Sequence, residues 1–139
     1  MHWLAAFNTF IFLTLGGLHV YWALGGRQGI ASALPATPDG TLQLRPSAAL
    51  TAAVAAGLLA MSALSAVPLV LGAATAPGWL RLGNGGLGLV FGLRALGDFR
   101  YVGLSKRVHD TTFARLDTRY YTPLCLALAA SCATLALAA

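Results

Sequence analysis

The sequence predicts an all-α integral membrane protein, a bundle of four transmembrane helices. Hydrophobic residues make up 58% of the 139 residues and charged residues only 9%, whereas a soluble domain carries about 25% charged residues. A soluble fold of this length has too much surface for its volume to bury so many apolar side chains, but lipid solvates them. The length allows one domain, residues 1–139. Four apolar runs separated by turn-rich connections predict the four spans.

The first apolar run, residues 2–24, is long enough to cross a hydrocarbon core of about 30 Å. Ala31-Ser32-Ala33 resembles a signal-peptide cleavage site. However, no Lys or Arg precedes the run, and the run is longer than the apolar part of a signal peptide. We therefore expect a retained helix. Glycines and prolines in the following loop, residues 25–46, exclude regular structure over most of its length.

The second and third runs span residues 47–74 and 80–102. Pro68 lies well inside the second run and predicts either a kink or an early end. Ala76-Pro77-Gly78 forms the turn between the two runs. In the third run, Gly88 and Gly92 make a small-residue face that lets a helix approach closely, within the chain or in a homo-oligomer.

The final run spans residues 120–139. Thr122-Pro123 fits an N-cap followed by proline at the first helical position, and a start at Thr118 with Asp117 as the cap fits equally well. Cys125 and Cys132 lie about 10 Å apart along the helix at 1.5 Å per residue, which is too far for a disulfide. The chain has no metal-like Cys/His spacing, so we expect no metal and no cofactor.

Basic residues predict the orientation. The loops after the first and third helices hold six of them, and the opposite side holds only Arg81. The positive-inside rule places loops 25–46 and 103–119 in the cytoplasm and both termini outside. A bias toward Ala, Leu, Gly and Arg is typical of a GC-rich bacterium, so we expect a bacterial cytoplasmic membrane. The six residues are Arg27, Arg45, Lys106, Arg107, Arg115 and Arg119.

The net charge of +5 indicates contact with the lipid bilayer and not with nucleic acid, because the basic residues flank apolar runs at headgroup level. The predicted topology gathers the polar and aromatic side chains at the cytoplasmic end. The outer half carries almost no ionisable group, which argues against a continuous hydrophilic pore in a monomer, although a homodimer could enclose one. The candidate site residues are His19, Tyr21, Trp22, Arg94, Asp98, Arg100, Tyr101, Asp117, Arg119, Tyr120 and Tyr121.

Arg94 is the most informative candidate, because it lies about a dozen residues into the third run, near the membrane midplane or slightly cytoplasmic of it. An arginine at that depth costs about 2.5–3.5 kcal/mol and is usually paired. Asp98 is one turn further along and shares the same helix face. The two residues form either an ion pair that fixes packing or a binder of anionic or polar groups tuned by Asp98. His19 is either a hydrogen-bonded structural residue or, beside Asp98 or Asp117, an acid/base.

The remaining candidates also have structural interpretations. The four aromatic residues fit an interfacial belt, Asp117 fits a helix cap, and Arg119 fits a headgroup contact. The aromatic residues are Tyr21, Trp22, Tyr120 and Tyr121.

Three segments carry a resemblance to a known family: LHVYW at 18–22, LRALGDFRYVG at 93–103 and LDTRYYTPLC at 116–125. The chain resembles a family of small bacterial four-helix membrane proteins catalogued as a domain of unknown function. The resemblance covers essentially the whole chain. It implies the fold and coincides with the cytoplasmic set of polar residues, but it names no chemistry.

Three functions remain open. The first is a cytoplasm-facing site that binds or moves a small amphipathic molecule or lipid. The second is an enzyme for a lipid-like substrate, with His19 or Asp98 as acid/base and Arg94 as electrostatic stabiliser. The third is an accessory or scaffold subunit without its own ligand. An open cavity around Arg94, Asp98, His19 and Tyr121 would favour the first two, and a tight Arg94–Asp98 pair without a void would favour the third.

Overall fold

The computed structural model describes residues 1–72 and 77–138. In these residues the regular structure is helical, without β-strands and with one isolated bridge between Ala36 and Leu42. The elements are α1 (His2–Ala23), α2 (Ile30–Ala33), α3 (Ala48–Leu71), α4 (Trp79–Leu96), α5 (Thr112–Leu116), a π-helical turn η2 (Asp117–Tyr121) and α6 (Thr122–Ala138).

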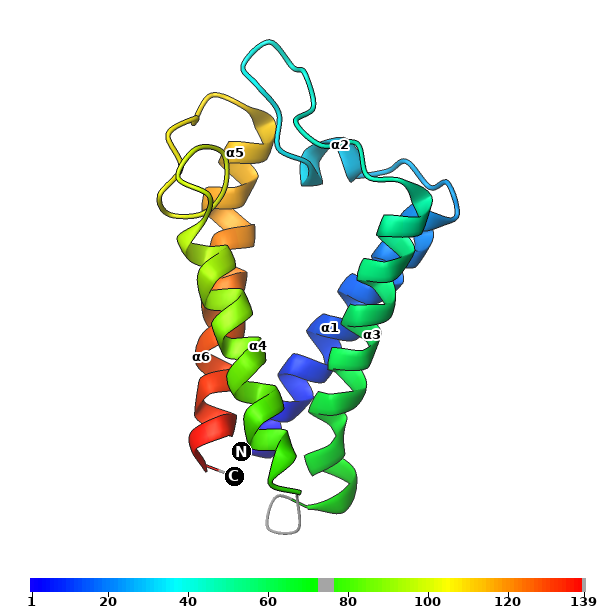
Figure 1. Cartoon of the computed structure of the whole chain (residues 1–139), viewed down its shortest axis with the longest axis vertical. Coiled ribbons are helices and arrows are strands. Elements are labelled where there is room, and N and C mark those ends of the chain that lie inside the picture. The colour runs from blue at the N-terminus through cyan, green and yellow to red at the C-terminus, as the bar shows by residue number, and fades with distance from the viewer. Residues whose placement is uncertain (73–76, 139) are drawn as a thin grey trace.

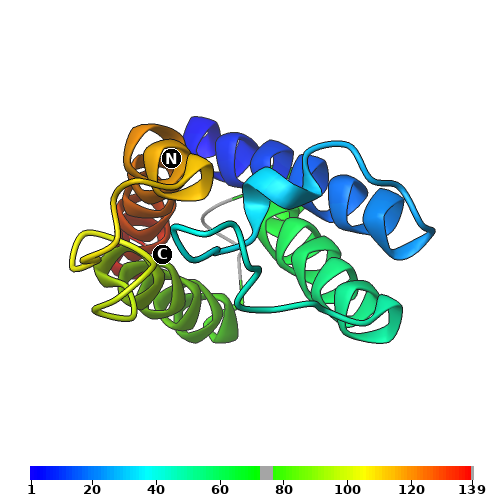
Figure 2. The same cartoon turned by 90° about the horizontal axis from the view of Figure 1, so that it is seen from above.

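Two antiparallel helical hairpins form a V (Figure 1). One hairpin pairs α1 with α3, and the other pairs α4 with α6. Both chain termini lie at the narrow end, while α2 and α5 lie at the wide end (Figure 1). The view from above shows the segment around α2 passing over the space between the hairpins (Figure 2).

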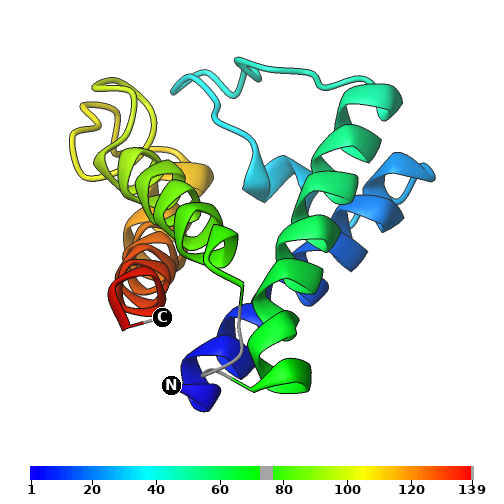
Figure 3. The same cartoon turned by 60° about the horizontal axis from the view of Figure 1, so that its bottom comes forward.

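Each of the four long helices contributes to one buried apolar layer. Phe12, Leu58, Leu87 and Leu128 form this layer together with Cys132. The ring of Phe12 lies 5.4 Å from that of Phe91, centroid to centroid. Many other large apolar side chains are exposed on the outer faces of the helices, the distribution expected when lipid is the solvent. The two hairpins thus meet at this layer, and they diverge toward the end that holds α2 and α5 (Figure 1 and Figure 3).

Three helical stretches are long and apolar enough to cross a membrane: His2–Ala23, Ala48–Leu71 and Thr112–Leu137. The prediction of an all-α membrane protein is confirmed at this level. The helix α4 is not among the three, because its 18 residues include Arg81, Arg94 and several glycines. The predicted count of four spans is therefore not confirmed.

The helices α1 and α3 agree closely with the first two predicted runs, 2–24 and 47–74. Ser47 caps α3, since its hydroxyl accepts a hydrogen bond of 3.1 Å from the backbone N–H of Leu50. Pro68 lies inside α3, which ends at Leu71. The predicted helix ends at residues 74 and 139, and Ala76 of the predicted turn, lie outside the described residues.

The third helix ends at Leu96, so its predicted extension to residue 102 is wrong. Gly97 has a φ of +95°, a left-handed conformation that turns the chain out of the helix. The chain then returns, and Leu104 and Ser105 donate backbone hydrogen bonds of 2.8 and 3.0 Å to the carbonyls of Ala95 and Leu96. The last carbonyls of α4 are therefore satisfied by the loop that follows.

The last helical stretch starts much earlier than predicted. Its cap is Thr111, whose hydroxyl accepts from the backbone N–H of Ala114 at 3.0 Å. The helix continues through η2, where the N–H of Thr122 donates to the carbonyl of Asp117 five residues back. The wider turn accommodates Pro123, which lacks an N–H and would crowd the carbonyl one turn earlier in a regular α-helix. Both predicted caps, Thr122 and Asp117, are wrong, because the helical stretch has already begun at Thr112.

Candidate functional site

A cavity of about 550 Å³ lies between the hairpins at the wide end of the V. Its walls are mostly apolar, and it is bounded by α1, the connection from 28 to 46, α3, the end of α4 and the start of α6. The polar side chains in its lining are those of His19, Gln28, Ser32, Thr51, Arg94 and Tyr121, besides the indole of Trp22.

The segment from 28 to 34 covers the cavity and is attached to both hairpins. The indole N–H of Trp22 on α1 donates to the carbonyl of Gln28 at 2.8 Å. The hydroxyl of Tyr121, at the end of η2, donates to the carbonyl of Ser32 at 3.3 Å. Gly29, with a φ of +78°, makes the turn that leads into α2. Two aromatic side chains therefore fix the cover to opposite walls of the cavity.

His19 lines the α1 wall. Its Nδ1 lies 2.8 Å from the carbonyl oxygen of Leu15. A carbonyl only accepts hydrogen bonds, so Nδ1 carries the proton of this bond. The ring also meets Trp22 edge-on at 5.0 Å between centroids. His19 is thus held by α1 itself.

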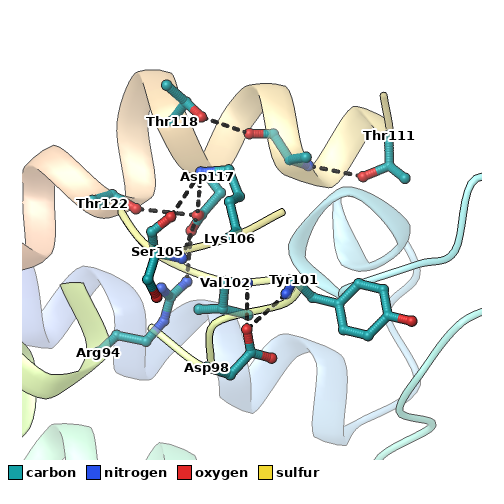
Figure 4. A network of polar contacts seen from close by, with 12 residues as sticks. Arg94, Asp98, Tyr101, Val102, Ser105, Lys106, Thr111, Asp117, Thr118 and Thr122 are labelled. Atoms are coloured by element: carbon teal, nitrogen blue, oxygen red, sulfur yellow. Dashed lines mark hydrogen bonds and ion pairs between the residues drawn. The ribbon is translucent and has the colours of Figure 1, made fainter. Parts of the chain in front are cut away.

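Arg94 connects the cavity to a buried carboxylate. One guanidinium nitrogen, Nη2, donates to Oδ1 of Asp117 at 2.9 Å (Figure 4). The Asp117 side chain is 0% exposed, whereas that of Arg94 is 34% exposed and lines the cavity. The other terminal nitrogen, Nη1, has no hydrogen-bond partner among the described residues. Nη1 is itself buried, so the part of Arg94 that is exposed beside the cavity is the rest of its side chain.

Asp117 is the centre of a polar network that joins three parts of the fold. Its Oδ2 accepts from the backbone N–H of Gly103 at 2.9 Å and from the ammonium of Lys106 at 3.1 Å. The hydroxyl of Thr122 donates to the same oxygen at 3.1 Å. Lys106 also donates to the carbonyl of Gly103 at 3.0 Å. One buried carboxylate thus holds two cations, so the network has a net positive charge beside the cavity (Figure 4).

Asp98 shapes the loop after α4. Its Oδ1 accepts backbone hydrogen bonds of 2.9, 2.7 and 2.9 Å from Arg100, Tyr101 and Val102. Desolvation acts to raise the pKa of Asp98, but the three N–H groups outweigh it and hold that pKa below its usual value. Phe99 has a φ of +62° inside this turn. Asp98 therefore stabilises the turn that follows α4.

Four of the predicted site residues line the cavity: His19, Trp22, Arg94 and Tyr121. The predicted Arg94–Asp98 pair is wrong, since Arg94 pairs with Asp117 and Asp98 binds backbone N–H groups. The helix α4 ends two residues after Arg94 and places it in the last turn. The pairing error follows from a helix that is predicted to continue to residue 102.

The other predicted residues lie at the same end of the molecule but do not line the cavity. Arg100 stacks on Tyr101 at 5.1 Å, and Arg119 stacks on Tyr120 at 5.3 Å. Tyr21 is exposed near the end of α1. These side chains surround the site without facing the cavity.

Sequence reasoning missed Lys106 as a site residue, together with the cover 28–34 and the α3 wall at Leu50, Thr51 and Val54. Lys106 is the chain's single lysine and follows a predicted helix that holds three arginines, so its position indicates topology first. The available sign was that the loop 103–119 holds only two aspartates, Asp110 and Asp117, against four cations. Leu50 and Val54 are apolar, and apolar residues on lipid-solvated helices carry no signal that distinguishes a cavity from a lipid face.

Two further predictions can be compared with the fold. Cys125 and Cys132 are buried and form no disulfide, as their spacing predicts. Gly88 packs against α6 of the same chain, since a Cβ there would lie 3.3 Å from the carbonyl oxygen of Ala129, whereas a Cβ on Gly92 would meet nothing within 4 Å. Within the described residues, no group of three His, Cys, Asp or Glu side chains is placed to hold a metal ion.

The family described as protein of unknown function DUF3995 matches residues 12–132. The chain belongs to this family. The three segments that carry the resemblance lie entirely within the matched range and supply Arg94, Asp98 and Asp117. The predicted resemblance to a family of unknown function is thereby confirmed. No curated protein and no solved structure matches the chain.

Proposed function

We propose that the chain is a multi-pass protein of the bacterial cytoplasmic membrane with four spanning helices. The helix α4 runs antiparallel to α6 and packs along it, and α6 lies in a candidate span, so both helices occupy the same depth. Both termini lie outside and loops 25–46 and 103–119 lie in the cytoplasm. The early end of α4 supports this orientation, because it adds Arg100 to the basic residues at the wide end.

We further propose that the protein binds, or moves, a small amphipathic molecule or lipid in the cavity between the hairpins. The observation that carries this proposal is an apolar cavity of about 550 Å³ whose few polar groups include a guanidinium. Small-molecule sites have volumes of about 300–1,000 Å³ and combine apolar walls with a few oriented polar groups. The cavity has that character.

The polar groups indicate the chemistry of the ligand's head. The Arg94 side chain is 34% exposed and lines the cavity, and the network behind it has a net positive charge because two cations pair with one carboxylate. Such a group favours a carboxylate or another anionic or carbonyl oxygen. Leu15, Leu18 and Val54 supply apolar wall for the tail.

A second candidate function, an accessory subunit without its own ligand, is favoured by one observation. Four groups donate hydrogen bonds to the Asp117 carboxylate, and these bonds fix the loop after α4 to the last helix. That arrangement is sufficient to explain why an ion pair is kept at this place. A ligand experiment on the cavity separates the two functions.

The experiment uses Trp22 as a reporter, because it lines the cavity. Trp3 and Trp79 are changed to Phe, and the protein in lipid nanodiscs is titrated with brominated stearate, which quenches indole fluorescence on contact. We expect saturable quenching of Trp22. Arg94→Gln should weaken the apparent affinity by about tenfold or more, since a hydrogen bond to a charged group contributes about 1.5–3 kcal/mol. Arg107→Gln in the exposed loop is the control and should have no effect.

A second pair of variants avoids the Asp117 network. Val54→Phe fills the cavity from α3, whereas Val70→Phe changes an 80% exposed position on the same helix. We expect loss of saturable quenching in the first variant only. Linear quenching that is equal in all variants would show partition into lipid alone and would refute the binding proposal in favour of the accessory role.

A further inference from the structure

The half of the bundle next to the termini contains a buried polar layer. One turn from the apolar layer of Phe12, Leu58, Leu87 and Leu128, each helix places a neutral polar side chain in the interior. A further serine lies on α3 another turn along. The buried residues of this polar layer are Asn8, Ser62, Ser65, Asn84 and Ser131.

Four atoms of this layer have no hydrogen-bond partner among the described residues. They are Oδ1 of Asn8, Oδ1 of Asn84, and the hydroxyl oxygens of Ser65 and Ser131. The amide nitrogens of the two asparagines are satisfied: Asn8 donates to Sγ of Cys132 at 3.3 Å, and Asn84 donates to the carbonyl of Leu80 at 2.9 Å. The unsatisfied groups come from all four long helices.

The two serines depart from the usual behaviour of hydroxyls in this protein. Thr9, Thr14 and Thr134 each donate to the carbonyl four residues before them, at 2.7–2.8 Å. Ser65 and Ser131 have no such bond. An unpaired polar group inside a membrane protein is costly, and water cannot reach it from the lipid side. The hydroxyls therefore need an occupant inside the bundle.

Water meets the needs of this layer, because it can donate to the two amide oxygens and both donate to and accept from the two hydroxyls. We propose that Asn8, Ser65, Asn84 and Ser131 form a second, hydrated polar compartment, and that the apolar layer at Phe12 is a closed gate between this compartment and the cavity. The two spaces are then the halves of one path across the membrane.

The arrangement of the hairpins fits such a path. Helix packing is extensive within each hairpin and limited between them, so each hairpin can rotate as a unit about the Phe12 layer. Rocking of this kind opens one side of a membrane protein as it closes the other. That the path carries an amphipathic molecule rests on the proposed function of the cavity. Hydration of the compartment does not depend on it.

The two cysteines allow a direct test, because Cys132 lies where the apolar layer meets the polar layer and accepts a hydrogen bond from Asn8, whereas Cys125 lines the cavity. In Cys125→Ser proteoliposomes we expect Cys132 to react with a small hydrophilic methanethiosulfonate reagent, since a thiol must be hydrated to ionise and react. Asn84→Leu, which removes an amide without touching the thiol, should slow this reaction by about tenfold. Thr134→Ala, on the exposed face of α6, is the control and should leave the rate unchanged.

Reaction of Cys132 only after denaturation, or an equal rate in Asn84→Leu, would overturn the proposal. A second measurement is the melting temperature of Ser65→Ala and Ser131→Ala. Loss of a hydroxyl that binds water should lower it or leave it unchanged, whereas removal of a truly unpaired hydroxyl should raise it. A rise in both variants would contradict the hydrated compartment.

The same reagent separates this proposal from the proposed function. In Cys132→Ser the remaining thiol, Cys125, reports on the cavity alone, and stearate should protect it from reaction. Protection of Cys125 with an unreactive Cys132 leaves a one-sided binding site and removes the path. A reactive Cys132 with an unprotected Cys125 confirms the hydrated compartment and removes the amphipathic ligand.

Discussion

Replacement of Asp117 by asparagine removes the negative charge at the centre of the network while keeping the side chain's shape. The Lys106 side chain is 4% exposed, so its ammonium stays buried without a counter-ion after the change. Arg94 is 34% exposed and is able to turn toward the cavity, so its pairing contributes less. Loss of one partner from a buried ion pair costs about 3–5 kcal/mol. Because Arg94 is able to turn away and only Lys106 stays buried, we expect the free energy of unfolding to fall by about 3 kcal/mol.

The measurement is the free energy of unfolding in mixed micelles, followed by circular dichroism during a titration with a denaturing detergent. A loss of about 3 kcal/mol corresponds to a change of roughly 150-fold in the equilibrium constant. The control is Asp39→Asn, because Asp39 lies exposed in loop 25–46 and contacts the hydroxyl of Thr41. We expect no measurable change there.

A double variant tests the stated cause. If the cost arises from the stranded ammonium, Lys106→Met in the Asp117→Asn background should recover about 1 kcal/mol or more. A loss below about 1 kcal/mol in Asp117→Asn, or the absence of any recovery in the double variant, would refute the reasoning.

Three further predictions concern the loop after α4 and the glycines. Asp98→Asn should destabilise the protein by about 1 kcal/mol at neutral pH. The pKa of Asp98 in the folded protein lies below its usual value of 3.8, so the stability difference from the wild type should be constant above pH 3.8 and disappear as the pH falls through the lowered pKa. Unfolding titrations at several pH values measure this difference. Gly103→Ala should cost about 2 kcal/mol or more in a thermal melt, because φ is +79° and a Cβ would lie 2.6 Å from the Ala95 carbonyl, whereas Gly92→Ala, in open helix, should be neutral or stabilise by up to about 1 kcal/mol. Gly88→Ala should lower the melting temperature at every protein concentration, since its contact is within the chain; a concentration-dependent effect on dimer content would instead support the homo-oligomer expected at this face.

Much of the architecture follows from the sequence because lipid solvation acts on whole segments. An apolar run of the right length crosses a membrane irrespective of which of its residues face inward. The runs 2–24 and 47–74 therefore appear as α1 and α3 nearly where they were predicted. The gathering of polar residues at one end is predictable for the same reason, since His19 and Asp117 lie near the ends of apolar runs.

The errors lie where a local pattern had two solutions. Residues 97–102 continue an apolar run, but Gly97 and the backbone hydrogen bonds to Asp98 favour a turn. Thr122-Pro123 is a common helix start, but a π-turn lets the helix pass through the proline. In both places, hydrogen bonds outside the regular α-helical pattern favour the observed conformation, and helix periodicity carries no information about them.

The sequence by itself determined that this chain is a helical membrane protein, where its apolar segments lie, and which end is polar, because these properties depend on composition along the chain. Only the tertiary structure decided that Arg94 pairs with Asp117 and not with Asp98, that Lys106 joins them, and that a cavity opens beside them. The physical reason is that a charge inside the bundle takes the counter-ion that three-dimensional packing brings within reach, and that counter-ion lies 23 residues away along the chain.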